Sequence, residues 1–125
     1  MANILLVDDE EVILSIVSSL LEVEGHTVSS ALGGEKAIEM FKANDYDVMI
    51  SDIRMSPING ISVLEVAVCE KPNMKNIILT AMRSDAVKKE TLGLGAKAFI
   101  TKPFQPDEFI STVTDVIDGK AIKHI

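Results

Sequence analysis

The sequence has 125 residues, 47% of them hydrophobic, which is enough for one compact domain with its own core. Nineteen acidic and twelve basic side chains give a formal net charge of -7, which repels nucleic-acid phosphates and anionic membrane surfaces. The single cysteine excludes an internal disulfide, and no apolar run approaches the roughly 20 residues that a membrane span needs. We therefore expect a cytoplasmic domain that contacts neither nucleic acid nor membrane directly.

Short runs rich in β-branched residues alternate with longer amphipathic stretches along the chain. The runs predict strands at residues 3–7, 27–31, 47–51, 76–80 and 97–101. The stretches predict helices at about residues 9–24, 34–43, 60–70, 85–92 and 106–118. Right-handed crossovers place the intervening helices above and below a parallel sheet. The predicted fold class is therefore α/β, a doubly wound five-stranded parallel sheet with five helices.

The first predicted helix carries more apolar residues than one face requires. The stripe expected to face the sheet has helical spacing and consists of Ile13, Ile16, Val17 and Leu20. Its two flanks add Leu14 with Leu21 and Val12 with Val23. Gly25 is expected to end the helix. The flanking residues either pack under neighbouring loops or form a docking patch.

Polar side chains stand where the predicted strands end. Asp8 and Asp9 follow the first strand, Asp52 follows the third, Thr80 closes the fourth, and Lys102 follows the fifth. Because the carboxyl ends of parallel strands meet at one edge of a sheet, we expect these side chains to converge. Three carboxylates so close repel one another unless a hard cation with oxygen ligands offsets them. Mg²⁺ is the natural occupant of such a cluster.

Each of these residues, taken alone, has an ordinary structural explanation. Asp9 could cap the first helix, and Asp52 could be a turn residue at the end of its strand. Thr80 could complete its strand, and Lys102 could be a solvated surface charge. A purely structural explanation must place all of them on one sheet edge by coincidence. We therefore favour a functional site.

Four segments resemble the receiver domain of two-component response regulators. They are ILLVDDE at residues 4–10, DIRMSPING at 52–60, IILTA at 77–81 and GAKAFITKPF at 95–104. The resemblance runs over essentially the whole chain and implies a CheY-like, flavodoxin-like sheet with strand order 2-1-3-4-5. It also implies a phosphoacceptor in a phosphorelay. Such a protein is not a metabolic enzyme but catalyses its own phosphorylation and a slow dephosphorylation.

The resemblance assigns the acceptor and the metal ligands by position. Asp52 is the residue that would be phosphorylated and would also be a metal ligand. Asp9 would bind Mg²⁺ directly, Asp8 would bind it through water, and the backbone carbonyl of Arg54 would be a further ligand. Mn²⁺ could take the place of Mg²⁺.

The resemblance also assigns switch and structural residues. Thr80 would bond the phosphoryl group, and Lys102 would pair with it. Phe99 would be the aromatic side chain whose rotamer follows the switch, although its apolar strand explains it equally well as a core residue. Pro103 matches the proline whose preceding peptide bond is cis, and Gly60 matches the glycine eight residues after the acceptor.

The loop after Asp52 departs from the family pattern. The family usually places Pro four residues after the acceptor, whereas this chain has Ser56 there and Pro57 next. We expect intact metal binding with altered mobility of this loop. Asn59 can cap the third helix as the commoner Asp would.

Partners follow from the resemblance as well. The phosphodonor would be a sensor histidine kinase or a histidine phosphotransfer protein. A downstream protein would bind the face formed by the fourth helix, fifth strand and fifth helix, with Lys88, Lys89 and Thr91 as contributors. A phosphorylation-dependent homodimer is a further expectation. Residues 1–119 would form the receiver domain, and residues 120–125 a short tail without an effector domain.

Two other functions fit the sequence less well. A phosphatase of the haloacid-dehalogenase type also uses a nucleophilic Asp with Mg²⁺, Thr and Lys. Its nucleophile follows the first strand with a second Asp two residues on, whereas here adjacent Asp8 and Asp9 come first and Asp52 stands alone. A flavodoxin-like flavin module is disfavoured because no Ser/Thr-rich phosphate loop follows the first strand.

Overall fold

The computed structural model describes residues 1–122 as an alternation of strands and helices. The elements are β1 (Asn3–Asp8), α1 (Glu11–Val23), β2 (Thr27–Leu32), α2 (Gly34–Ala43), β3 (Val48–Ser51), α3 (Gly60–Glu70), β4 (Lys75–Thr80), α4 (Asp85–Leu94), β5 (Ala98–Thr101) and α5 (Pro106–Asp118). Every predicted strand and helix is present, with ends that differ by no more than two residues. The last part of the predicted tail, residues 123–125, lies outside the described residues.

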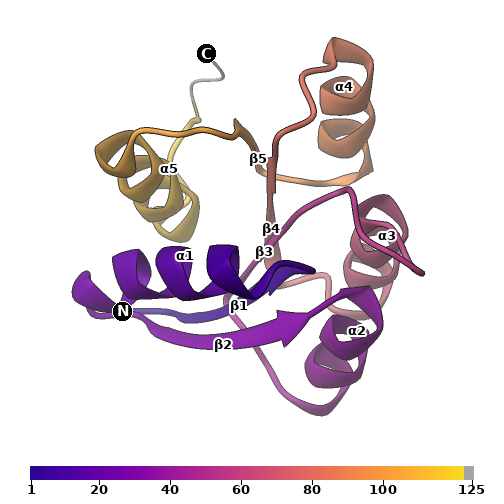
Figure 1. Ribbon diagram of the computed structural model, residues 1–125, viewed down its shortest axis with the longest axis horizontal. Helices are drawn as coiled ribbons and strands as arrows, with labels where there is room; N and C mark the ends of the chain where they lie inside the picture. Colours follow the sequence, from indigo (N-terminus) through magenta and orange to yellow (C-terminus); the bar gives the residue numbers. More distant parts are fainter. Residues whose placement is uncertain (123–125) are drawn as a thin grey trace.

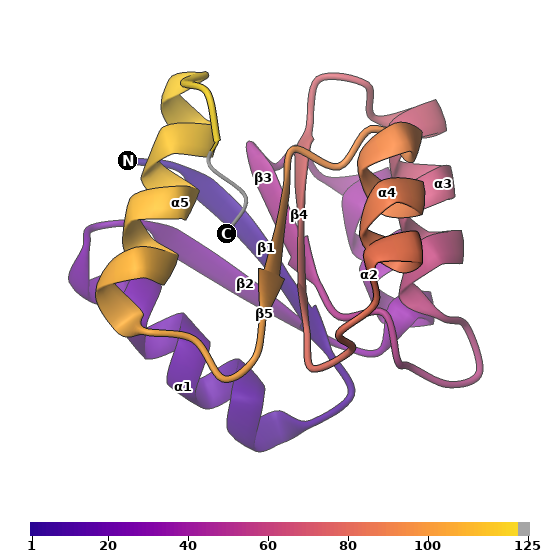
Figure 2. The same ribbon diagram turned by 90° about the horizontal axis from the view of Figure 1, so that it is seen from above.

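The strands form one parallel sheet in the order β2-β1-β3-β4-β5. Helices α1 and α5 cover one face, and α2, α3 and α4 cover the other, as Figures 1 and 2 show. The predicted doubly wound α/β fold and its strand order are thus confirmed. Within residues 1–122, no helix combines the length and the apolar character needed to cross a membrane.

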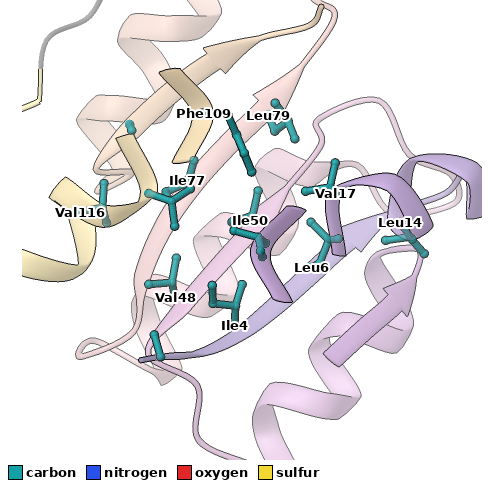
Figure 3. Packing of buried hydrophobic residues seen from close by; sticks show 14 residues of the cluster. Ile4, Leu6, Leu14, Val17, Val48, Ile50, Ile77, Leu79, Phe109 and Val116 are labelled. Atoms are coloured by element: carbon teal, nitrogen blue, oxygen red, sulfur yellow. The ribbon is translucent and has the colours of Figure 1, made fainter. Parts of the chain in front are cut away.

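The central strands are buried on both faces, and their side chains alternate between two cores. The core under α1 and α5, shown in Figure 3, takes every second residue of β1, β3 and β4. These residues are Ile4, Leu6, Val48, Ile50, Ile77 and Leu79. The residues between them, such as Leu5 and Met49, pack under α2 and α3. Apolar contacts on both faces therefore fix the strands that carry the polar edge residues.

The apolar stripe predicted for α1 is confirmed at Val17, which is buried, and at Ile13 and Leu20, which are partly buried against the same core, but it is wrong at Ile16. The buried residues are Leu14, Val17 and Leu21, whereas Ile16 is 53% exposed. The most deeply buried neighbours of Val17 are Leu14, three residues before it, and Leu21, four residues after it. The predicted neighbours were Ile13, four residues before Val17, and Leu20, three residues after it. Both spacings fit helical periodicity, and the wide apolar arc of α1 does not choose between them. Gly25, with φ +92°, follows the helix as the predicted glycine stop.

Helix α4 corrects one further expectation. Thr91 was expected on the exposed output face, but it is fully buried, and its hydroxyl donates to the Lys88 carbonyl. Thr91 is the buried residue of α4, so its side chain faces the protein interior and not the surface. Lys88 and Lys89 remain at least partly exposed on the same helix.

The corrected apolar stripe of α1 predicts which truncation on this helix is costly. Leu21→Ala should lower the free energy of unfolding by about 2 to 5 kcal/mol, because it leaves a cavity in the core. Ile16→Ala, the matched control, should change the free energy of unfolding by only about 0.5 kcal/mol, because most of the side chain faces solvent. Urea denaturation of both variants measures the difference. Equal losses would show that Ile16 packs in the core.

Candidate functional site

The ammonium group of Lys102 joins the ends of two central strands. Its Nζ donates to Oδ2 of Asp8, at the end of β1, and to Oδ2 of Asp52, directly after β3, at 2.9 Å in each case. The side chains of Lys102, Asp8 and Asp52 are only 14%, 3% and 10% exposed. Three of the residues predicted at this sheet edge therefore meet in one buried ion-pair network.

The charge state of Lys102 follows from its surroundings. Burial alone would lower the pKa of Lys102, but the hydrogen bonds that its ammonium donates to Asp52 and Asp8, together with the negative charges of these residues, outweigh burial and raise the pKa. Lys102 is therefore a cation throughout the neutral range. Its contribution to stability is fully present below the ordinary lysine pKa and is lost as the pH rises through the raised value.

Asp52 is held by its own loop as well as by Lys102. Its Oδ1 accepts the backbone N–H groups of Ile53 at 2.6 Å and Arg54 at 3.3 Å. The two oxygens thus have different partners, with backbone amides on Oδ1 and the ammonium on Oδ2. The carboxylate is therefore held by its own loop through one oxygen and by Lys102 through the other.

A cluster of carboxylates lies beside this network. Ligand oxygens of Asp8, Asp9 and Glu10 lie within 4.8 Å of one another, and Asp8 Oδ1 also accepts the Glu10 backbone N–H at 3.1 Å. Oxygen donors of this kind fit Mg²⁺ or Mn²⁺. Asp52 is not a member of the cluster and is linked to it through Lys102 and Asp8.

Glu10 is the residue that the sequence reasoning missed. No role is assigned to Glu10 from the sequence, where it appears only at the end of the motif at residues 4–10. A third consecutive carboxylate after a buried strand is the signal that could have identified it. Its side chain is exposed, as is that of Asp9, so both lie on the solvent side of the buried Asp8.

The ends of β4 and β5 complete the edge. Thr80 is buried, and its hydroxyl oxygen accepts the Met82 N–H at 3.2 Å. The Lys102 backbone N–H donates to the Thr80 carbonyl at 2.8 Å. Thr80 therefore supplies the predicted hydroxyl group, and its backbone carbonyl also fixes the backbone at Lys102.

Phe99 lies on β5 and is buried on the α3 and α4 side of the sheet. It belongs to an apolar cluster that includes Ile53, the residue directly after Asp52. The cluster also contains Leu64 of α3 and, at its margin, Val87 of α4. Phe99 is therefore a core residue in this conformation, and it links the Asp52 loop to α4 through packing.

The loop after Asp52 is closed by Gly60. The Gly60 N–H donates to the Ile53 carbonyl at 2.8 Å, and a Cβ at position 60 would overlap the Asp52 backbone carbonyl. Asn59 caps α3 as predicted, with its side-chain oxygen accepting the Ser62 N–H at 3.0 Å. The close approach at Gly60 gives a steric reason for a glycine eight residues after the acidic residue.

Two proline peptide bonds near the site are cis. One is Lys102–Pro103, as the family resemblance implied, and the other is Ser56–Pro57, at the position where the loop departs from the family pattern.

Comparison with known proteins gives one consistent result. The family model described as the response regulator receiver domain matches residues 4–114. The response regulator SaeR of Staphylococcus aureus is 32% identical over 117 residues, which are 94% of this chain and 51% of SaeR. The chain thus spans about half the length of the curated relatives it matches.

Solved structures agree with the family match. A response regulator receiver domain protein (CheY-like) from Methanospirillum hungatei superposes with a TM-score of 0.91 at 28% identity, covering 95% of each chain. The response regulator TrrA from Thermotoga maritima, solved in complex with Mg²⁺-BeF, has a TM-score of 0.84 at 32% identity and covers 93% of this chain and 99% of its own.

The close approach at Gly60 predicts a large effect for a one-carbon substitution. Gly60→Ala should lower the free energy of unfolding by about 2 kcal/mol or more, because backbone must move to admit the methyl group. The matched control is Gly93→Ala in α4, where a Cβ meets nothing within 4 Å. That change should raise stability by about 0.5 to 1 kcal/mol. Chemical denaturation of both variants checks this, and a neutral Gly60→Ala would contradict it.

Proposed function

The chain belongs to the response regulator receiver-domain family, and on this premise we propose that it is the phosphoacceptor of a two-component phosphorelay. Asp52 takes a phosphoryl group from a sensor histidine kinase or a histidine phosphotransfer protein. The observation that best supports this role is the ammonium of Lys102, which lies 2.9 Å from both Asp8 and Asp52. Lys102 thus places a positive charge beside Oδ2 of Asp52, while Oδ1 of Asp52 is held by backbone N–H groups.

The chemistry that this proposal requires is a single in-line displacement. An Asp52 carboxylate oxygen forms a bond to phosphorus, and the bond from phosphorus to the donor histidine nitrogen breaks. The electron pair of that bond leaves with the imidazole, which is then protonated. Two negatively charged groups must approach each other, so positive charge at the site lowers the barrier. Lys102 supplies part of that charge by moving its hydrogen bond from Asp52 to the phosphoryl oxygens.

The metal proposed for this site is Mg²⁺, or Mn²⁺ in its place. Asp9 and Asp52, the Arg54 carbonyl and, through water, Asp8 would hold it, with Glu10 beside them. When bound, the cation would supply further positive charge to the phosphoryl oxygens. The carboxylate oxygens of Asp8, Asp9 and Glu10, which lie within 4.8 Å of one another, support the aspartate part of this assignment. TrrA, a relative at 32% identity that was solved in complex with Mg²⁺-BeF, supports the choice of metal.

The proposed response to phosphorylation starts at Thr80. Phosphoryl oxygens on Asp52 would accept a hydrogen bond from the Thr80 hydroxyl, which stabilises one of two states of the β4–α4 connection. Phe99 would follow this movement, because it packs in the same cluster as Ile53. The α4, β5 and α5 face would then change its affinity for a downstream protein, with Lys88 and Lys89 as contributors.

The remaining proposals concern extent and context. We propose that residues 1–119 form the receiver domain, in line with the family match over residues 4–114. We propose a cytoplasmic location, where a kinase would supply the phosphoryl group, and a homodimer that forms on phosphorylation.

Removal of the acceptor carboxylate tests the proposal. Incubation with acetyl phosphate and Mg²⁺ should add one phosphoryl group to the wild-type chain and none to Asp52→Asn, as measured by intact mass. Asp45→Asn is the matched control, because the Asp45 side chain is 96% exposed and pairs only with Lys71 among the described residues. It should be labelled as fully as the wild type. Labelling of Asp52→Asn to the wild-type level would refute the assignment.

A further inference from the structure

A groove of about 570 Å³ runs between β5 and α5 and is not part of the Asp52 site. In Figure 2, β5 lies between α5 on one side and α4 on the other. Phe99 and Ile100 of β5 line the groove, as do Phe104 from the β5–α5 connection and Phe109 from the start of α5. The ring centroids of Phe104 and Phe109 are 4.7 Å apart. Phe104 and Ile100 are only partly buried, so apolar surface remains open to a ligand.

The charged residues that line the groove are all acidic. They are Asp107 and Glu108 in the first turn of α5 and Asp115 farther along it. No lysine or arginine among residues 1–122 lines the groove. Lys102 stands next in sequence to lining residues, but its ammonium is bound to Asp8 and Asp52. Among residues 1–122, no lining side chain therefore neutralises the negative rim.

Basic residues near the far end of α5 belong to a different hollow. It measures about 350 Å³ and is lined by Lys75, Lys97 and Lys120, and Ile122 separates it from the acidic groove. The Lys75 ammonium donates to the carbonyls of Val116 and Ile117 at 2.9 and 3.2 Å, where it satisfies the carboxyl end of α5. The acidic groove thus keeps its negative character up to Ile122.

We propose that this groove docks a segment of a partner protein in which an apolar anchor is flanked by Lys or Arg. An aromatic floor with a polar rim is the usual anatomy of a docking site, and an all-acidic rim selects a basic occupant. A second copy of this chain is the weaker candidate, because two chains with a formal net charge of -7 repel each other.

The spacing of the acidic residues sets the spacing of the basic ones. Glu108 and Asp115 are seven residues apart on α5, which is two helical turns and about 10 Å. A helical partner that lies along α5 matches this distance with basic residues at positions i and i+7 and the apolar anchor between them. The partner is therefore a basic amphipathic helix with a two-turn repeat.

This inference rests on the proposed function, because the groove is the β5 and α5 part of the face assigned there to a downstream protein, and it adds the chemical class of that partner. Phe99 and Thr101 of β5 line the groove, and Lys102, which follows Thr101, binds Asp52. A change at Asp52 can therefore alter the groove through Lys102 and β5. Affinity for the basic segment would then depend on phosphorylation. Docking itself requires only the groove and is measurable in the unphosphorylated chain.

The probe is a 14-residue helical peptide of Leu and Ala with two Lys residues seven positions apart, compared with the same peptide carrying Glu in place of Lys. NMR titration should show saturable shifts of β5 and α5 amides with the Lys peptide and none with the Glu peptide. Glu108→Gln combined with Asp115→Asn should weaken binding about fivefold, as expected for two partly exposed ion pairs. Glu35→Gln combined with Glu39→Gln on α2 removes the same charge on the opposite face and should leave the affinity unchanged.

Three results would overturn the inference. They are shifts outside β5 and α5, equal weakening by both double variants, and dimerisation through the groove in analytical ultracentrifugation. Intact-mass measurement of phosphorylation reports on Asp52 separately. A chain that docks the Lys peptide but takes no phosphoryl group would retain the groove assignment and refute the proposed function. A chain that is phosphorylated but does not bind the Lys peptide would retain the proposed function and refute the groove assignment.

Discussion

The positive charge of Lys102 allows two buried carboxylates to share one sheet edge. Asp8 and Asp52 would otherwise be desolvated anions with no cation between them, which is among the most costly arrangements in a protein. The ammonium offsets both charges at 2.9 Å, and the backbone of the same residue is bound to Thr80. The contact requires β1 beside β3, and β5 separated from β3 by β4 alone, so the parallel order β2-β1-β3-β4-β5 is a condition for the site.

The surrounding structure holds this contact in place and connects it to the surface. The apolar residues of the central strands are buried on both faces, which fixes the strand ends. Gly60 lets the loop after Asp52 pass close to its own carbonyl, and Ile53 ties that loop to the cluster around Phe99. Phe99 in turn lines the β5 and α5 groove. Packing therefore links the proposed acceptor to a proposed docking surface across one strand.

The amino-acid sequence predicts the elements, their order and the edge residues well, because β-branched runs and strand-ending polar residues are local signals. It fails where several arrangements satisfy the same local pattern. The arc of α1 is wide enough to admit two rotations, and only contact with the sheet buries Leu21 and exposes Ile16. Thr91 reads as a polar surface residue, yet burial depends on the orientation of α4 against the sheet. The acidic groove joins residues of a strand, a helix and the segment after it, so no sequence spacing reveals it.

The pKa of Lys102 tests the central claim most directly. Two opposing effects act on it, because burial favours the neutral amine while Asp8 and Asp52 favour the ammonium. NMR titration of the Lys102 side chain, without divalent cations, should give a pKa above that of a free lysine side chain, and Asp52→Asn should lower it. A pKa at or below the free value would show that the carboxylates do not hold the ammonium between them, and would contradict this account.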